Sequence, residues 1–138
     1  MPRHKDYLPQ GVIPAALLPF HEDLSIDAAS FRSHLRDVAS VTGISAITIN
    51  AHATEVASCS FDEQKLVLEI AQDEIGARVP IVNGIYTEGP FEAVRLARMA
   101  DAGGASAPNA AFPRTTAAPP TNIGEHRCHD TKTICPRA

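Results

Sequence analysis

Two side chains that often take part in enzyme chemistry lie within one short segment. His52 and Glu55 both fall in Ala51–Glu55, directly after a short run of β-branched residues. The imidazole of His52, neutral or protonated, can donate a hydrogen bond to a carboxylate or transfer a proton. Glu55 can act as a general base. The simpler interpretation gives both side chains ordinary structural contacts in a loop, and the sequence leaves both interpretations open.

Tyr86 and Cys59 are two further candidates. Tyr86 follows another β-branched run, so it can line a substrate pocket or simply pack within a loop. Cys59 precedes a predicted helix, and a helix N-terminus can lower the pKa of a thiol. However, no partner base lies at a suitable spacing. We therefore expect Cys59 to be a passive thiol.

A group of potential zinc ligands lies near the C-terminus and comprises His126, Cys128, His129 and Cys135. Zinc is commonly bound by Cys and His, but this group lacks the paired C-x2-C spacing of a zinc knuckle. No G-x-G-x-x-G motif follows the first predicted strand, so nothing marks a dinucleotide site. We predict neither a metal nor a cofactor.

Short apolar runs predict the strands that position these side chains. The runs are Gly11–Leu18, Ile44–Asn50 and Val79–Ile85. Continuously apolar segments of this length are typical of strands buried on both faces of a parallel sheet.

Helical patterns alternate with these runs. The first predicted helix spans Asp27–Ser40. The second begins with the capping box that Ser60 and Glu63 form, and the third begins at Pro90, which suits the first position of a helix. The resulting β-α-β-α-β-α order predicts repeated parallel βαβ units, which build both doubly wound sheets and eight-stranded barrels.

The amino-acid composition of the chain changes at Pro108. The stretch Pro108–Ala138 holds five of the eleven prolines and few large apolar side chains. Such a segment buries too little apolar surface to offset the entropy lost on ordering. We therefore predict a partial barrel-type domain over 1–107 and an irregular tail over 108–138.

Composition excludes several classes of partner. The net charge of −4 and the pI of about 5.8 give no reason to expect nucleic acid or an anionic membrane. No run approaches the roughly 20 apolar residues of a membrane span. Pro14 and Pro19 interrupt the first apolar stretch, which argues against a signal peptide. Three cysteines do not make a disulfide framework, so we expect a cytoplasmic protein.

Several of these motifs together resemble the dihydrodipicolinate synthase/N-acetylneuraminate lyase family. They are Gly11–Pro14, Leu18–Phe20, Ala51–Glu55, Pro80–Gly84 and the pattern from Glu92 to Gly103, in that order along the chain. The resemblance runs from Gly11 to about Ala107. It implies the N-terminal part of a TIM (β/α)8 barrel, about three βα units, in a lyase or aldolase. Such enzymes bind pyruvate or another 2-oxo acid as a lysine Schiff base, and commonly form homo-oligomers.

The loop that holds the substrate carboxylate in this family usually carries two hydroxyl residues between two glycines, followed by a glutamate. Here the matching residues are Ala51–Glu55, so the hydroxyl positions hold His52 and Ala53, and Thr54 follows them. The resemblance implies that these three residues bind substrate, through the His52 imidazole and the amides of Ala53 and Thr54. The departure from the family pattern puts the identity of the oxo acid in doubt.

The catalytic tyrosine and lysine of the family have no counterparts in this chain. Its lysines are Lys5, Lys65 and Lys132, and none lies in the apolar or cationic setting that frees a Schiff-base amine. We therefore assign no catalytic residue. Two hypotheses remain open: a divergent lyase acting on a 2-oxo acid, or an inert truncated product whose tail arises from a frameshift.

Overall fold

The structure is a computed structural model that describes residues 4, 6–8 and 10–111. Three strands, β1 (Ile47–Ile49), β2 (Ile81–Tyr86) and β3 (Ala107–Ala111), form a parallel sheet in the order β1-β2-β3. Three helices, α1 (Ala28–Ala39), α2 (Phe61–Glu74) and α3 (Pro90–Ala102), alternate with the strands. The βα alternation predicted from the sequence is confirmed.

The three helices begin where the sequence predicts. The Asp27 side chain accepts a hydrogen bond from the Ser30 amide at the start of α1. At the start of α2, the Ser60 hydroxyl accepts from the Glu63 amide, and the Glu63 carboxylate accepts in return from the Ser60 amide at 2.7 Å. Pro90 occupies the first turn of α3. Local capping chemistry therefore sets all three helix starts.

The predicted first strand does not form as a regular strand. Residues 12–16 lie parallel to the start of β1 and pair only through isolated bridges, Val12 with Ile44 and Ala15 with Thr48. The Thr48 amide donates to the Pro14 carbonyl and the Ala16 amide donates to the Thr48 carbonyl, both at 2.8 Å. Pro14 has no amide hydrogen of its own, so the ladder is interrupted there.

The predicted change to irregular chain at Pro108 is wrong for the residues that the structure describes. Strand β3 includes Pro108, which is paired with Asn83 of β2. An edge strand tolerates proline because the missing amide hydrogen can face away from the neighbouring strand. The remainder of the predicted tail, 112–138, lies outside the described residues.

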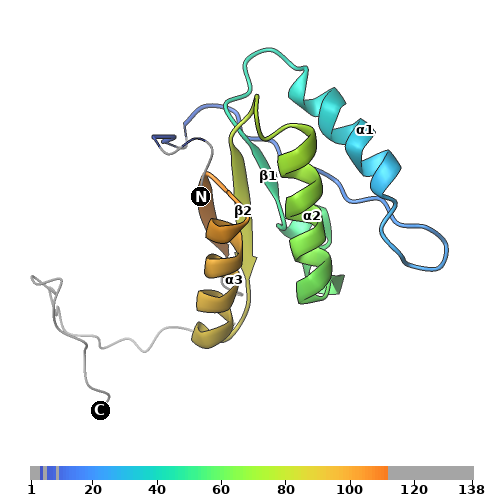
Figure 1. The fold of residues 1–138 in the computed structure, drawn as a ribbon, viewed down its shortest axis with the longest axis vertical. Helices are drawn as coiled ribbons and strands as arrows, with labels where there is room; N and C mark the ends of the chain where they lie inside the picture. The colour runs from blue at the N-terminus through green and yellow to red at the C-terminus, as the bar shows by residue number, and fades with distance from the viewer. Residues whose placement is uncertain (1–3, 5, 9, 112–138) are drawn as a thin grey trace, which may run out of the picture.

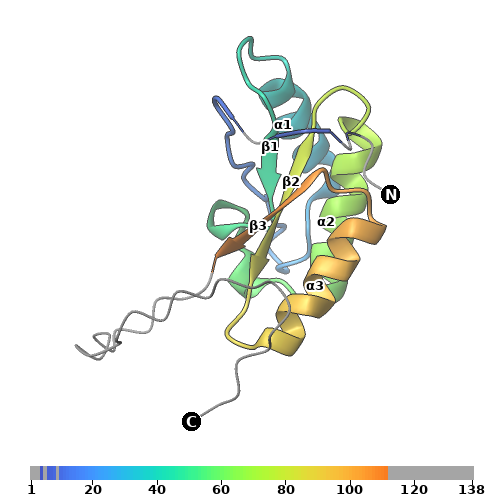
Figure 2. The same cartoon turned by 90° about the vertical axis from the view of Figure 1, so that its left-hand side faces the viewer.

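The strand order and the helix positions favour a barrel over a doubly wound sheet. Each strand pairs with its neighbours along the chain, with no reversal of order. Helices α2 and α3 lie side by side on one face of the sheet (Figures 1 and 2). A doubly wound sheet carries helices on both faces and reverses its strand order, whereas a barrel adds units in sequence with the helices outside. The described part therefore has the strand order and helix placement of the N-terminal portion of a TIM barrel.

A single apolar cluster joins the sheet to all three helices. Its fully buried members include Phe31 and Leu35 of α1, Ile47 and Ile49 of β1, Val67 of α2 and Ile81 of β2; Leu96 of α3 is also buried in it. The cluster fixes the strands relative to the helices, so the loops that leave the carboxyl ends of the strands start from rigid positions. Among the residues that the structure describes, no helix is long and apolar enough to cross a membrane.

An ion-pair group ties α1 to α2. Arg36 donates to the Glu74 carboxylate at 2.8 Å, and Arg32 donates to Glu74 at 3.1 Å and to Asp73 at 2.7 Å. The hydrogen bonds from Arg36 and then Arg32 hold the pKa of Glu74 below its ordinary value. The stabilisation is present above the unfolded-state pKa and is lost as the pH falls through the lower folded-state pKa.

We expect the Glu74→Gln substitution to reduce the loss of stability on acidification. Urea unfolding at about pH 7 and about pH 3.5 measures that loss, since the window covers the carboxylate pKa values. Glu69→Gln is the matched control on the same helix, because Glu69 has only a 3.6 Å ion pair with Lys65. An equal acid-induced loss in the Glu74→Gln and wild-type proteins would contradict this assignment.

Candidate functional site

The candidate site begins at the carboxyl end of β1. Asn50 follows the strand with a φ of 51°, in the left-handed region that asparagine tolerates better than most residues. Two short 3₁₀ turns come next, His52–Thr54 and Val56–Ser58, and they are joined at Glu55, which also has a left-handed φ of 53°. The Thr54 amide donates to the Ala51 carbonyl at 2.9 Å, which closes the first turn.

Thr54 anchors this loop to the segment 12–16, which lies against β1. Its side chain is fully buried, and its hydroxyl donates to the carbonyl of Ala16 at 3.0 Å. The amide of Ala51 also approaches the Thr54 hydroxyl, at 3.4 Å. The hydroxyl and the amide of Thr54 are thus both used within the protein. Of the three predicted substrate-binding residues, Thr54 is placed as a brace behind the loop.

His52 lies at the surface of the loop and meets Tyr86 of the neighbouring strand. The two ring centroids are 5.0 Å apart and the ring planes are inclined at 79°, an edge-to-face arrangement. His52 is exposed and Tyr86 is half-buried. The sequence marked each residue separately, and the parallel pairing of β1 with β2 brings them together. Ala53, which is half-buried, follows His52 in the same turn.

This arrangement offers hydrogen-bond donors at the carboxyl ends of two parallel strands. An imidazole N–H and a phenol O–H can each donate to an anionic oxygen, and both rings are held by the contact between them. Within the described residues, the Ala53 amide donates to no backbone or side-chain acceptor. Three donors of these kinds suit the oxygens of a small carboxylate, because each of them can present a hydrogen.

Glu55 does not join the ring pair. Its exposed side chain lines a separate cavity of about 360 Å³, together with Phe20, Leu24, Ser58 and Glu63. The Glu55 carboxylate makes no hydrogen bond with any described residue, so the predicted bonding to backbone amides is not seen among them. The interpretation of Glu55 as a general base stays a prediction.

Cys59 has the properties of a passive thiol. Burial raises the pKa of the Cys59 thiol, and the nearby carboxylates of Glu63 and Glu55 raise it further. A raised pKa keeps the sulfur protonated and weakly nucleophilic. The described residues hold no group of three or more His, Cys, Asp or Glu side chains that would bind a metal. The potential zinc ligands near the C-terminus, His126, Cys128, His129 and Cys135, lie outside the described residues.

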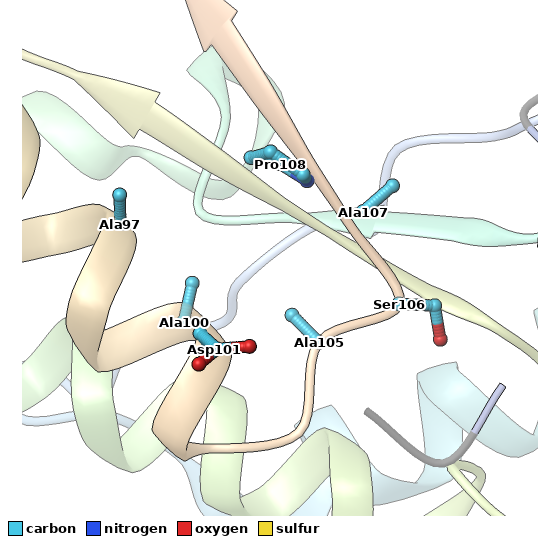
Figure 3. A pocket seen from close by; sticks show the side chains of 7 residues that line it. All are labelled: Ala97, Ala100, Asp101, Ala105, Ser106, Ala107 and Pro108. Carbon is cyan, nitrogen blue, oxygen red and sulfur yellow. The ribbon is translucent and has the colours of Figure 1, made fainter. Parts of the chain in front are cut away.

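Two further cavities lie away from this loop. One of about 220 Å³ lies between the end of α3 and the beginning of β3, where Ala100 and Ala105 point into it and Asp101 is its one charged lining residue (Figure 3). Because β3 is parallel to β1 and β2, this cavity lies at the opposite end of the sheet from His52 and Tyr86. The other lies between α2 and α3 and is lined by residues such as Phe61 and Met99.

Sequence reasoning missed two buried asparagines beneath the ring pair. Asn50 and Asn83 are 1 % and 0 % exposed. Their Nδ2 and Oδ1 atoms lie 2.8 Å apart, with Asn50 donating. The signal was present, because a buried β-branched run with one asparagine near its end occurs twice in succession. Such a polar residue within a buried strand needs a partner.

Comparisons with known proteins show similarity to one enzyme family. The model of the dihydrodipicolinate synthetase family matches residues 8–126, which extends past Ala107, where the motifs quoted above end. A 4-hydroxy-tetrahydrodipicolinate synthase of Methanothrix thermoacetophila is 38% identical over 98 residues, covering 71% of this chain and 32% of that protein. The enzyme of the same name from Salinibacter ruber is 35% identical over 99 residues, again covering 71% and 32%.

Solved structures show the same fold. The 4-hydroxy-tetrahydrodipicolinate synthase of Methylacidiphilum fumariolicum SolV superposes with a TM-score of 0.72 at 22% identity, over 77% of this chain and 35% of that one. The dihydrodipicolinate synthase of Aquifex aeolicus gives a TM-score of 0.68 at 25% identity, over 73% and 34%. The chain spans about a third of the length of the relatives that it matches.

Proposed function

The chain belongs to the dihydrodipicolinate synthetase family, and we propose that its described part forms the carboxylate-binding portion of a lyase that acts on pyruvate or another 2-oxo acid. The observation that carries this proposal is the edge-to-face pair of His52 and Tyr86, 5.0 Å apart at the carboxyl ends of adjacent strands. In barrel enzymes the loops at that end of the strands form the active site.

Each residue of the loop has a distinct part in the proposed binding. The His52 imidazole and the Ala53 amide donate to the carboxylate oxygens, since both are partly or fully exposed. Tyr86 holds the imidazole and offers its hydroxyl as a further donor. Thr54 supports the loop from behind through its bond to Ala16 and makes no direct contact with the substrate. Hydrogen bonds to a charged group typically contribute about 1.5–3 kcal/mol each.

The family resemblance implies a lysine Schiff base, which the described residues do not provide near this loop. Lys65 is the one lysine among them, and it lies on α2 with its side chain 57% exposed and paired with Glu69. A Schiff-base lysine needs a desolvated setting or a neighbouring cation, and the exposed position of Lys65 beside a carboxylate supplies neither. In this proposal the described part holds the acid and does not form the imine.

The alternative proposal is a chain without turnover of its own, and the position of Lys65 is the observation that favours it. Incubation of the full chain with pyruvate and borohydride, followed by intact-mass measurement, separates the two. A stable mass gain on a lysine would establish a working imine site. An unchanged mass would support the alternative, a chain without turnover of its own.

We expect pyruvate to change the NMR signals of His52 and Ala53 in the 138-residue chain. The His52→Ala substitution should weaken pyruvate binding by about tenfold, because it removes one charge-assisted hydrogen bond. His21→Ala is the matched control, since His21 is also an exposed imidazole but lies on another loop. Equal affinities of the two variants, or signal changes that avoid residues 51–55, would rule out this binding site.

A further inference from the structure

We infer that Asn50 and Asn83 are positioning residues: their buried amide pair holds His52 against Tyr86 and so sets the geometry of the carboxylate site. Only the ligand in this inference rests on the proposed function. The placement of the two rings is a property of the protein without ligand, and it can be tested separately.

The amide pair connects three elements in one hydrogen-bond network. Asn50 Nδ2 donates to Asn83 Oδ1 at 2.8 Å and to the carbonyl of Gln64, in the first turns of α2, at 2.9 Å. Asn83 Nδ2 donates to the carbonyl of Gly84 at 2.8 Å. Both side chains are almost completely buried. In such surroundings hydrogen bonds are strong and directional, so the network resists displacement of any of its members.

The backbone around the pair is equally constrained. Asn50 has a left-handed φ of 51°, which turns the chain out of β1 and into the loop. The Asn50 carbonyl lies directly against Gly84, where a Cβ atom would come within 2.0 Å of the carbonyl oxygen. The pairing of Ile49 with Asn83 in the sheet brings these residues side by side. The end of β1 therefore has one permitted position on β2.

The two residues that carry the rings of the site are close in sequence to the members of this network. His52 lies two residues after Asn50, and Tyr86 lies two residues after Gly84. A sheet alone would be held at lower cost by two apolar side chains, because a buried amide loses its hydration. The directional pair instead fixes the relative position of two strand ends, which is what an edge-to-face ring contact requires. Positioning of this kind is how binding groups reach productive geometry.

The chain offers a matched buried amide away from the site. Gln72 of α2 is 7 % exposed and donates to the carbonyl of Gly104 at 2.7 Å. Gln72→Met removes a buried amide hydrogen bond, as Asn50→Gly does, but leaves the strand ends untouched. Glycine at position 50 can keep the left-handed backbone without strain, so Asn50→Gly removes the side-chain contacts at a small entropic cost. Asn83→Ala removes the other half of the pair.

The first readout is the nuclear Overhauser effect between the rings of His52 and Tyr86 in the full chain without ligand. We expect it to be present in the wild-type protein and in Gln72→Met, and lost in Asn50→Gly and Asn83→Ala. The second readout is the affinity for pyruvate. We expect it to fall by about tenfold in the two asparagine variants, the effect of misaligning one charged hydrogen bond, and to stay within about twofold in Gln72→Met.

The outcomes separate this inference from the proposed function. Loss of the ring contact in folded asparagine variants supports the positioning role even if pyruvate does not bind the wild-type protein, which would refute the proposed function alone. A ring contact that persists in either folded variant overturns the positioning role. Global unfolding of both variants, with Gln72→Met still folded, also overturns it, since the pair would then serve the stability of the sheet as a whole.

Discussion

The Gly84→Ala protein is expected to lose at least about 3 kcal/mol of unfolding free energy, the upper range for overpacking a tight contact. The added Cβ would lie 2.0 Å from the Asn50 carbonyl oxygen and 2.6 Å from its carbon. Both atoms belong to backbone that is held by the sheet and by the buried amide pair. No side-chain rotation can relieve this contact, so β1 and β2 must separate at their carboxyl ends.

Denaturant unfolding of the wild-type and substituted chains measures this loss. Gly89→Ala is the matched control, because a Cβ at Gly89 meets nothing within 4 Å and its φ of −111° suits any residue. Gly89 caps α3, so we expect its replacement to cost less than about 1 kcal/mol. Similar losses in the two variants would show that the close approach of Asn50 to Gly84 is not a constraint on the fold.

The Thr54→Val protein should be less stable by about 2 kcal/mol, although valine has nearly the same shape as threonine. The substitution leaves the carbonyl of Ala16 without the donor that Thr54 supplies at 3.0 Å. Ala16 is fully buried, and an unpaired buried carbonyl costs about 1–3 kcal/mol. The same change frees the loop from the segment that holds Ala16 beside β1, so the affinity for pyruvate should fall as well.

Thr54→Ser tests the cause, because serine keeps the hydroxyl and loses only a methyl group. Thermal unfolding should place Thr54→Ser between the wild-type protein and Thr54→Val. If the serine variant is as unstable as the valine variant, the packing of the methyl group supports the loop as much as the hydroxyl bond does. A Thr54→Val protein as stable as the wild-type protein would show that the bond from Thr54 to Ala16 does not support the loop.

Local chemistry in the sequence was sufficient to predict the helices. Ser60 and Glu63 cap α2 by hydrogen bonds within one helical turn. Pro90 begins α3 because its ring fixes φ near the helical value. The strands depended on more distant partners. The run Gly11–Leu18 is apolar enough for a strand, yet Pro14 breaks its ladder. Conversely, β3 contains small residues and a proline, and its pairing with β2 makes it a strand.

The candidate site could be predicted only in part from the sequence. His52 and Tyr86 were identifiable because each follows a predicted strand, which places them at one end of a parallel sheet. The roles of Thr54 and of the amide pair were not predictable, because they depend on how the strands align. Asn50 and Asn83 are 33 residues apart, and a shift of β1 by one residue would separate them. Register is a property of the assembled sheet, and no local pattern encodes it.

The order of the strands bears on how the chain folds during its synthesis. Ile47 pairs with Ile81 and Val82 with Ala107, so each pairing closes a loop that contains one helix. Such loops are short enough that the entropy of closure rises little from one unit to the next. When a strand emerges from the ribosome after its helix, the preceding strand, with which it pairs, has already been synthesised. The fold can therefore grow co-translationally by one unit at a time, with β2 ready to receive β3 as soon as α3 has formed.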